Sequence, residues 1–164
     1  MRFFTAILLA TLGGLSSTAD AKRFLGWSTA RGGESSLASS ANYGATRAMI
    51  NTNFPGSTIA SADTITTAAL QNIDIVWLGT TTSFNSAITP LSANERSALL
   101  AFIHGGGTLV LFADNSTFSA GAPAANSSLV SYLGVAVTGT LNGTVAHSIP
   151  APASSPFTGP YGSL

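Results

Sequence analysis

Seven polar residues of the chain stand directly after predicted strands, where the loops of an open α/β sheet meet a ligand. They are Ser28, Thr29, Arg31, Thr80, Thr81, Asp114 and Asn115. We expect the loops at residues 28–33, 80–83 and 114–117 to line one crevice. The alternative is that these side chains cap helices and satisfy loop backbone groups, which is their more common role.

The first of these loops could also hold an anion. Ser28-Thr29-Ala30-Arg31-Gly32-Gly33 follows the first strand, so backbone amides and the Arg31 guanidinium lie where a phosphate could bind. It is loosely similar to a flavodoxin phosphate loop but lacks the Thr-Gly-Asn order. Export of the protein, predicted below, also disfavours flavin, so we expect no cofactor.

The same segment nearly matches the Gly-x-Ser-x-Gly elbow of serine hydrolases. The last glycine is missing, and neither His104 nor His147 has an obvious acid partner. The chain has no cysteine, which excludes thiolate catalysis and cysteine metal sites. We therefore expect no catalytic residue.

Metal binding has little support, because two isolated histidines and scattered acids make no recognisable ligand spacing. Asp114 with Asn115 could hold a calcium ion through oxygens, although such an aspartate more often caps the following loop. Three matches to the glycosylation sequon, at Asn115, Asn126 and Asn142, are expected by chance in an Asn/Ser/Thr-rich chain if it is bacterial, as we expect.

Residues 74–115 contain the unit that must position these side chains. Two apolar runs, 74–79 and 108–113, are predicted strands buried on both faces. Between them, Ser92 and Glu95 form a predicted capping box at the start of a helix that Gly105 ends. The pattern predicts two neighbouring parallel strands in a three-layer α/β/α domain.

The remaining elements are predicted with weaker periodicity. We expect strands at 23–29 and 57–62, a helix at 35–50 with its central Gly44 unfavourable, and a short helix at 64–72 with Leu70 and Ile73 facing inward. Loops are expected at 30–34, 80–90 and 114–126, a helix at 127–133 stopped by Gly134, and a hairpin of strands 135–140 and 144–147.

Residues 1–21 are predicted to be a secretory signal peptide. Arg2 precedes a mostly apolar segment, and Ala19-Asp20-Ala21 matches the small-x-small cleavage pattern, so the mature chain should begin at Lys22. The alternative is a buried N-terminal helix. No other run is long and apolar enough to cross a membrane. We expect an α/β domain at 22–148 and a proline-rich irregular end at 149–164, from which we suspect a domain truncated at its C-terminus.

Charge and composition exclude some partners. Only 7% of residues are charged and the formal net charge is zero, with no basic cluster in the mature chain. Binding to nucleic acid or to an anionic membrane surface is therefore disfavoured. The chain is too hydrophobic to be disordered, and without cysteine it must rely on core packing.

The runs DIVWLGTTTSF, LSANERSALLAFIHGGGTLVLFADN, ANSSLVSYLGV and SPFTGPYG resemble the class I glutamine amidotransferase-like superfamily, in particular its ThuA-like and secreted members. Glu95, Leu99 and Phe102 match the family's helix. The chain is also similar to exported bacterial proteins with a PEP-CTERM sorting tail, although the tail itself is missing. The resemblance implies a flavodoxin-like fold with more strands than this chain holds.

The chain departs from the enzymes of that family at the nucleophile. Ala113-Asp114-Asn115 occupies the strand end where the family has cysteine, so no catalytic residue carries over. We expect an exported, non-catalytic binding or interaction module at the cell surface or outside the cell, with an extracellular polysaccharide or a surface protein as partner. The alternatives are a hydrolase of sugars, its acid being Asp114 or lying in a missing C-terminal part, and a purely structural interaction protein.

Overall fold

The structure is a computed structural model that describes residues 20–83, 85–135, 158–159 and 162–163. The chain divides into two units, Thr18–Asn142 and a second unit made of Met1–Ser17 with Gly143–Leu164. In the second unit, β7 (Thr158–Gly159) and β8 (Gly162–Ser163) pair antiparallel. Nearly all of the predicted leader and of the predicted hairpin, and most of the irregular end, lie outside the described residues.

The first unit is built on a four-stranded sheet in which every pair of neighbouring strands is parallel. Its order is β2-β1-β3-β6, with β1 at Arg23–Trp27, β2 at Thr58–Ala62, β3 at Ile75–Gly79 and β6 at Thr108–Phe112. The register places Trp77 opposite Val110. This confirms that the two apolar runs are neighbouring parallel strands.

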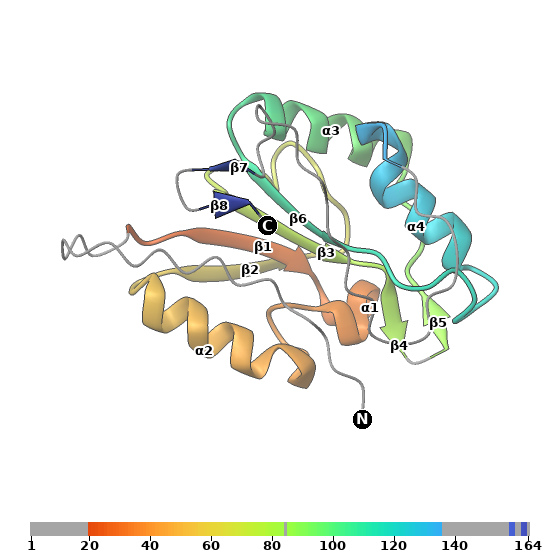
Figure 1. Cartoon of the computed structure of the whole chain (residues 1–164), viewed down its shortest axis with the longest axis horizontal. Helices are drawn as coiled ribbons and strands as arrows, with labels where there is room; N and C mark the ends of the chain where they lie inside the picture. The colour runs from red at the N-terminus through yellow and green to blue at the C-terminus, as the bar shows by residue number, and fades with distance from the viewer. Residues whose placement is uncertain (1–19, 84, 136–157, 160–161, 164) are drawn as a thin grey trace. The chain divides into compact units, whose positions relative to one another are not determined.

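Helices cover both faces of this sheet (Figure 1). The helix α2 (Gly44–Asn53) lies on one face, and α3 (Ala93–His104) and α4 (Ala122–Val130) lie on the other. A parallel sheet with this strand order and helices on both faces is a flavodoxin-like, three-layer α/β/α fold. The predicted fold class is therefore confirmed.

Short elements complete the unit. They are α1 (Thr29–Gly32), η1 (Gly33–Ser35), η2 (Ala41–Tyr43), β4 (Thr81–Ser83), β5 (Ser86–Ala87) and η3 (Ser131–Leu133). The strands β4 and β5 pair antiparallel, so part of the predicted loop at 80–90 is a small hairpin.

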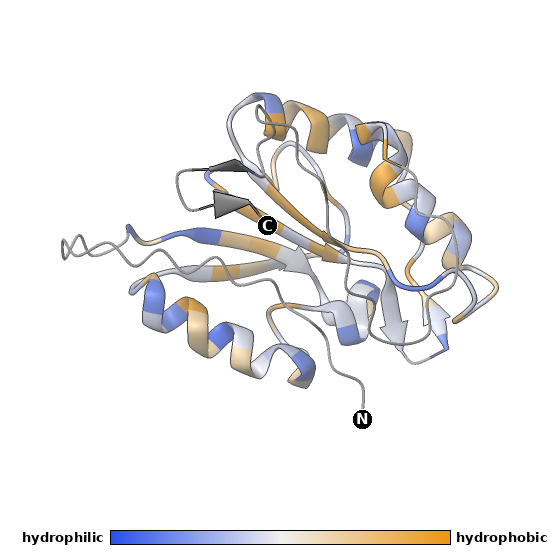
Figure 2. Cartoon of the chain, viewed as in Figure 1, coloured by the Kyte–Doolittle hydropathy of each residue, from blue (hydrophilic) through white to orange (hydrophobic). Residues whose placement is uncertain are grey.

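The buried residues form two clusters, one on each face of the sheet, because successive strand residues point to opposite sides. Leu25, Trp27 and Val76 belong to a cluster with Leu99 and Leu129 from α3 and α4. Phe24, whose side chain points to the other face, packs with Leu37 and Ile50 on the side of α2. Figure 2 shows apolar stretches along the strands and on the helices beside them.

The helix α3 begins at the predicted capping box. The Ser92 side chain accepts a hydrogen bond from the Glu95 amide at 3.3 Å, and the Ser92 amide donates to Glu95 Oε2 at 2.9 Å. At the other end the left-handed residue is Gly106, with φ +91°, one position later than the cap residue Gly105. The expected start and stop of this helix are both confirmed.

Three predicted elements differ from the structure. The helix expected at 35–50 is η1, a turn, η2 and then α2, because Gly44 begins α2 instead of lying inside a longer helix. The segment 64–72 forms hydrogen-bonded turns: the Leu70 amide donates to the Thr66 carbonyl and the Gln71 amide to the Ala68 carbonyl, and Asn72 has φ +61°, which a helix does not allow. The helix α4 starts at Ala122, earlier than predicted, with a proline in its first turn.

The burial of β6 also differs from the prediction. Leu109, Val110, Leu111 and Phe112 are only partly buried. Within the described sheet β6 is an edge strand, so it has a neighbour on one side only. No helix of the described residues is both long and apolar enough to cross a membrane.

Candidate functional site

The carboxyl ends of β1, β3 and β6 meet at one edge of the sheet, because the three strands are parallel. All seven predicted site residues lie at this carboxyl edge, but in two groups. Ser28, Thr29 and Arg31 follow β1, and Thr80, Thr81, Asp114 and Asn115 follow β3 and β6.

The residues after β1 form a short helix and its cap. Ser28 caps α1 by accepting a hydrogen bond from the Arg31 amide at 3.3 Å, and its hydroxyl donates to Asp63 Oδ1. The Thr29 and Ser39 hydroxyls share a hydrogen bond of 2.6 Å. The Gly-rich segment predicted as a loop is therefore helical at Thr29–Gly32.

The Arg31 guanidinium is bound inside the protein. It forms an ion pair with Glu95, in which Nη1 contacts Oε1 and Nη2 donates to Oε2 at 3.3 Å. It also donates to the Asp63 carbonyl at 2.6 Å and to the Thr89 carbonyl at 3.1 Å. Its carbon Cζ lies 4.1 Å from the centre of the Trp27 ring. With 11% of its side chain exposed, Arg31 is not placed to hold an anion from solution.

Glu95 is the buried acceptor at the centre of these contacts, with 4% of the residue exposed. Besides Arg31, its carboxylate accepts from the Ile65 amide at 3.0 Å and from the Ser92 amide and hydroxyl at 2.9 and 3.0 Å. Burial raises the pKa of Glu95, but hydrogen bonds from Arg31, Ser92 and Ile65 oppose it and lower the pKa to about 2. Glu95 is therefore ionised at neutral pH.

The second group is a hydrogen-bonded junction between β3, β6 and α4. The Asp114 carboxylate accepts from the Thr81 hydroxyl at 3.3 Å and from the Asn115 amide at 2.7 Å. The Asp114 amide donates to the buried Thr80 hydroxyl at 3.1 Å. Asn126, which the sequence did not single out as a site residue, donates to the Asp114 carbonyl at 2.6 Å. These contacts fix the loop after β6.

The protein's own backbone separates the two groups. Gly33 has φ +46°, and a Cβ built on it would lie 1.9 Å from the Thr82 carbonyl oxygen. The Ser35 hydroxyl accepts from the Thr81 amide at 3.2 Å, and a Cβ on Gly79 would lie 2.6 Å from the Ser35 Oγ. The chain thus packs against itself between the carboxyl ends of β1 and β3, where flavodoxin-like folds bind ligands.

A pocket of about 550 Å³ lies beside the first group, at the carboxyl edge. Its lining residues are Ala30, Arg31, Asp63, Thr64, Thr89, Pro90, Ser92 and Glu95. Asp63, Thr64, Thr89 and Ser92 are exposed polar residues of the rim, and Arg31 with Glu95 forms the buried wall. Sequence reasoning missed Asp63 and Thr64 as site residues, although both directly follow the strand β2.

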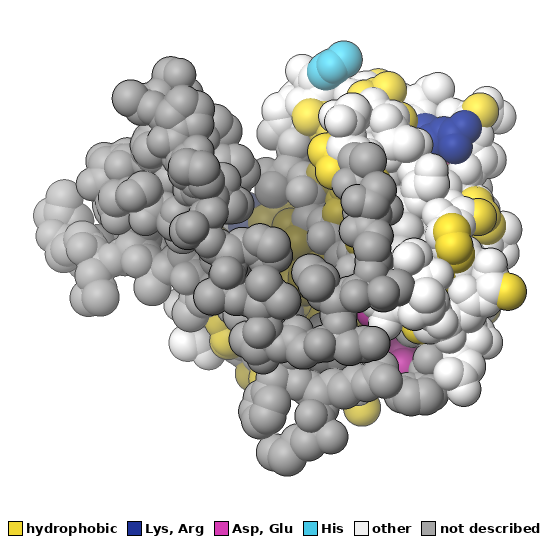
Figure 3. Space-filling model, turned by 45° about the vertical axis from the view of Figure 1, so that its right-hand side comes forward, with side chains coloured by type: hydrophobic (Ala, Val, Ile, Leu, Met, Phe, Trp, Pro, Cys, Tyr) yellow, Lys and Arg dark blue, Asp and Glu magenta, His cyan; other side chains and the backbone are white. Residues whose placement is uncertain are grey.

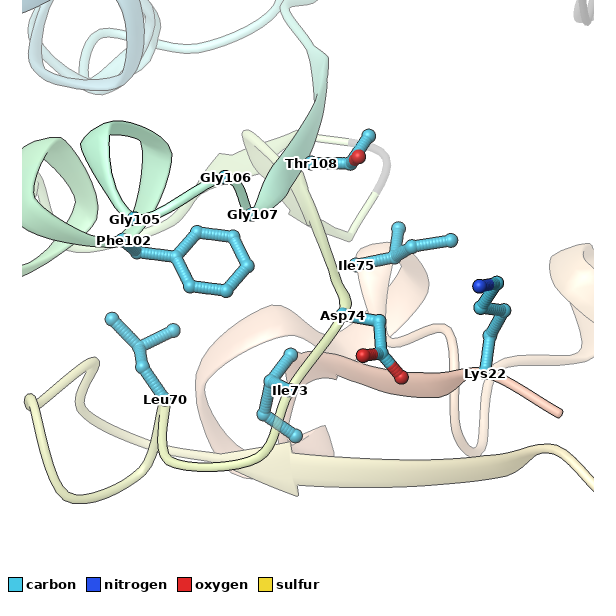
Figure 4. A pocket seen from close by; sticks show the side chains of 10 residues that line it. All are labelled: Lys22, Leu70, Ile73, Asp74, Ile75, Phe102, Gly105, Gly106, Gly107 and Thr108. Carbon is cyan, nitrogen blue, oxygen red and sulfur yellow. The ribbon is translucent and has the colours of Figure 1, made fainter. Parts of the chain in front are cut away.

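A second pocket, of about 500 Å³, lies at the opposite, amino edge (Figure 4). Leu70, Ile73 and Phe102 give it an apolar wall, and Gly105, Gly106 and Gly107 leave another part of its lining without side chains. The amides of these three glycines already donate within the chain, at 2.9 to 3.0 Å. The polar side chains in the lining of this amino-edge pocket are those of Lys22, Asp74 and Thr108.

The described residues place no histidine at the carboxyl edge. His104 ends α3, and this end of the helix lies at the amino edge. Within residues 20–83 and 85–135, no group of three His, Cys, Asp or Glu side chains could hold a metal ion. Ser28 therefore has an aspartate partner but no imidazole base among these residues.

Charged side chains are few and separate on the face shown in Figure 3. Comparisons of the chain with models of protein families, with curated proteins and with solved structures find no match. What is established is the class: a flavodoxin-like α/β domain with a pocket at the carboxyl edge of its sheet.

Proposed function

We propose that the protein is an exported, non-catalytic binding module whose ligand occupies the carboxyl-edge pocket. The observation that carries this proposal is the pairing of a largely buried wall, fixed by an ion pair and hydrogen bonds, with an exposed polar rim. Arg31 and Glu95 form an ion pair. The residues around the opening, Asp63, Thr64, Thr89 and Ser92, are exposed. A site fixed before the ligand arrives loses little conformational entropy on binding.

The chemistry of the rim favours a neutral, hydroxyl-rich ligand such as an extracellular polysaccharide. The Asp63 carboxylate can accept hydrogen bonds from sugar hydroxyls, and the Thr64 and Thr89 hydroxyls can both accept and donate. The Ser92 hydroxyl is already bonded to Glu95. An anionic ligand is disfavoured, because two carboxylates, Asp63 and Glu95, face one guanidinium, Arg31, in the pocket. Secretion, which the sequence of residues 1–21 predicts, would bring the module to such polymers.

The surroundings of the acidic residues do not support general acid catalysis. A general acid must carry a proton near neutral pH, whereas the pKa of Glu95 is about 2. Asp114, the acid of the hydrolase alternative, accepts hydrogen bonds from Thr81 and Asn115 and fixes a loop. Neither carboxyl group therefore favours the hydrolase over the binding module.

A glycan array followed by calorimetry tests the proposal. The mature protein should bind at least one neutral polysaccharide, and the double substitution Thr64→Ala with Thr89→Ala should weaken binding at least about tenfold, the loss of a few hydrogen bonds. Ser97→Ala is the matched control, because Ser97 is an exposed hydroxyl of α3 outside the pocket. It should leave affinity unchanged.

Two results would contradict the proposal. The first is the absence of binding to acidic and neutral polysaccharides alike. The second is hydrolysis of a bound polysaccharide that Asp114→Asn abolishes, which would establish the hydrolase alternative.

A further inference from the structure

The first strand of the sheet begins almost at the predicted cleavage site. Cleavage is expected between Ala21 and Lys22, and β1 starts at Arg23. The strand is an interior one, paired with β2 on one side and with β3 on the other. No spacer therefore separates the bond to be cut from the centre of the fold.

The residues just after this bond are held by hydrogen bonds to later parts of the chain. The Lys22 amide donates to Ser57 Oγ at 2.7 Å, and the Lys22 carbonyl accepts from the Thr58 amide at 3.0 Å. The Arg23 amide donates to Asp74 Oδ2 at 2.7 Å, and the Arg23 carbonyl accepts from the Asp74 amide at 2.9 Å. Both residues thus have their backbone donor and acceptor in use.

The next two residues are enclosed by the core. Phe24 is 3% exposed and Leu25 is 2% exposed, and they point to opposite faces of the sheet. A processing peptidase must bind the residues on both sides of the cleaved bond in an extended form with free backbone groups. In the folded domain these groups are not free.

We infer that the folded domain protects its own processing site, so the leader is removed only before β1 enters the sheet. Asp20 and Ala21 are exposed, which leaves space for a leader to remain attached to the folded domain. A precursor that folds too early is then a stable product that the peptidase cannot cut.

The strand order delays the pairing of β1 with its two neighbours. The partners that hold Lys22 and Arg23 lie 35 and 51 residues further along the chain. Pairing of parallel strands that are distant in sequence is slow, because the chain loses the entropy of loop closure before the stabilising contacts between the strands form. The central position of the first strand therefore leaves the cleavage site open until β2 and β3 have both emerged from the export machinery.

Cleavage of the full-length precursor by a purified signal peptidase in detergent tests this inference. One sample is added to the enzyme immediately after dilution from urea, and another is first allowed to fold, as followed by tryptophan fluorescence. Mass spectrometry measures the product that begins at Lys22. Folded precursor should be cut at least about a hundredfold more slowly, since cleavage then requires opening of the core.

An insertion provides the control for access. Eight Gly and Ser residues placed between Ala21 and Lys22 move the bond away from the sheet, and the folded form of this variant should be cut nearly as fast as the unfolded chain. Three results would overturn the inference. They are rapid cleavage of the folded native precursor, continued protection of the folded insertion variant, and failure of the peptidase to cut unfolded precursor after Ala21.

Discussion

Arg31 and Glu95 lie 64 residues apart in the sequence and form a buried ion pair that joins the helix after β1 to the start of α3. Glu95 also completes the capping box of α3 and accepts from the Ile65 amide. One carboxylate therefore links three segments that build the wall of the carboxyl-edge pocket.

Substitution of Arg31 by Ala should be strongly destabilising. It leaves the Glu95 carboxylate buried without its counter-ion, which typically costs about 3 kcal/mol or more in free energy of unfolding. Urea unfolding followed by tryptophan fluorescence measures this loss. The double variant Arg31→Met with Glu95→Gln should be more stable than Arg31→Ala, because no buried charge remains and glutamine can keep the capping box. Equal stability of the two variants would argue against the ion pair.

The stability of the protein should fall in acid through Glu95. The folded pKa, about 2, lies below the value of roughly 4.3 for an unfolded glutamate. The ionised group therefore stabilises the fold fully above the unfolded pKa, and this contribution is lost as the pH falls through the folded pKa. Urea unfolding between pH 6 and 2 should show this decline, and Glu95→Gln should make it shallower. An identical pH profile for both proteins would contradict the assignment.

Two glycine substitutions should have opposite effects. Gly33→Ala places a methyl group against the Thr82 carbonyl at a position with φ +46°, so it should cost about 2 kcal/mol or more. Gly44→Ala adds a methyl group in the first turn of α2, where nothing lies within 4 Å, and should stabilise by up to about 1 kcal/mol. Thermal unfolding of both variants measures the difference. If Gly33→Ala left the stability unchanged, this would contradict the close contact between Gly33 and the Thr82 carbonyl that separates the two groups of site residues.

The sequence predicted the parts of the fold that depend on local pattern. The apolar runs around Val76 and Val110 and the cap at Ser92 follow from short-range periodicity and helix capping, and the structure confirms them. The helix expected at 64–72 was wrong, because the segment forms turns that end at Asn72 with φ +61°, a left-handed conformation that single-residue propensity does not reveal.

The sequence predicted less of the candidate site than of the fold. The seven residues do lie at the carboxyl edge, as parallel strands require. The partner of Arg31 could not be inferred, since 64 residues separate it from Glu95 and no local rule connects them. Asp63 and Thr89 join the pocket only through the turn after β2 and the loop before α3. The closure of the expected crevice by Gly33 and Thr82 depends on backbone packing that composition does not encode.

A ligand should bind at the carboxyl-edge pocket and not at the amino edge. The most direct measurement is an NMR titration of the isotope-labelled mature protein with a polysaccharide fragment selected on the array. The amide signals of Thr64, Thr89 and Ser92 should shift with a common dissociation constant, while those of Gly105, Gly106 and Thr108 should stay fixed. Shifts confined to the amino-edge residues, or to neither set, would contradict it.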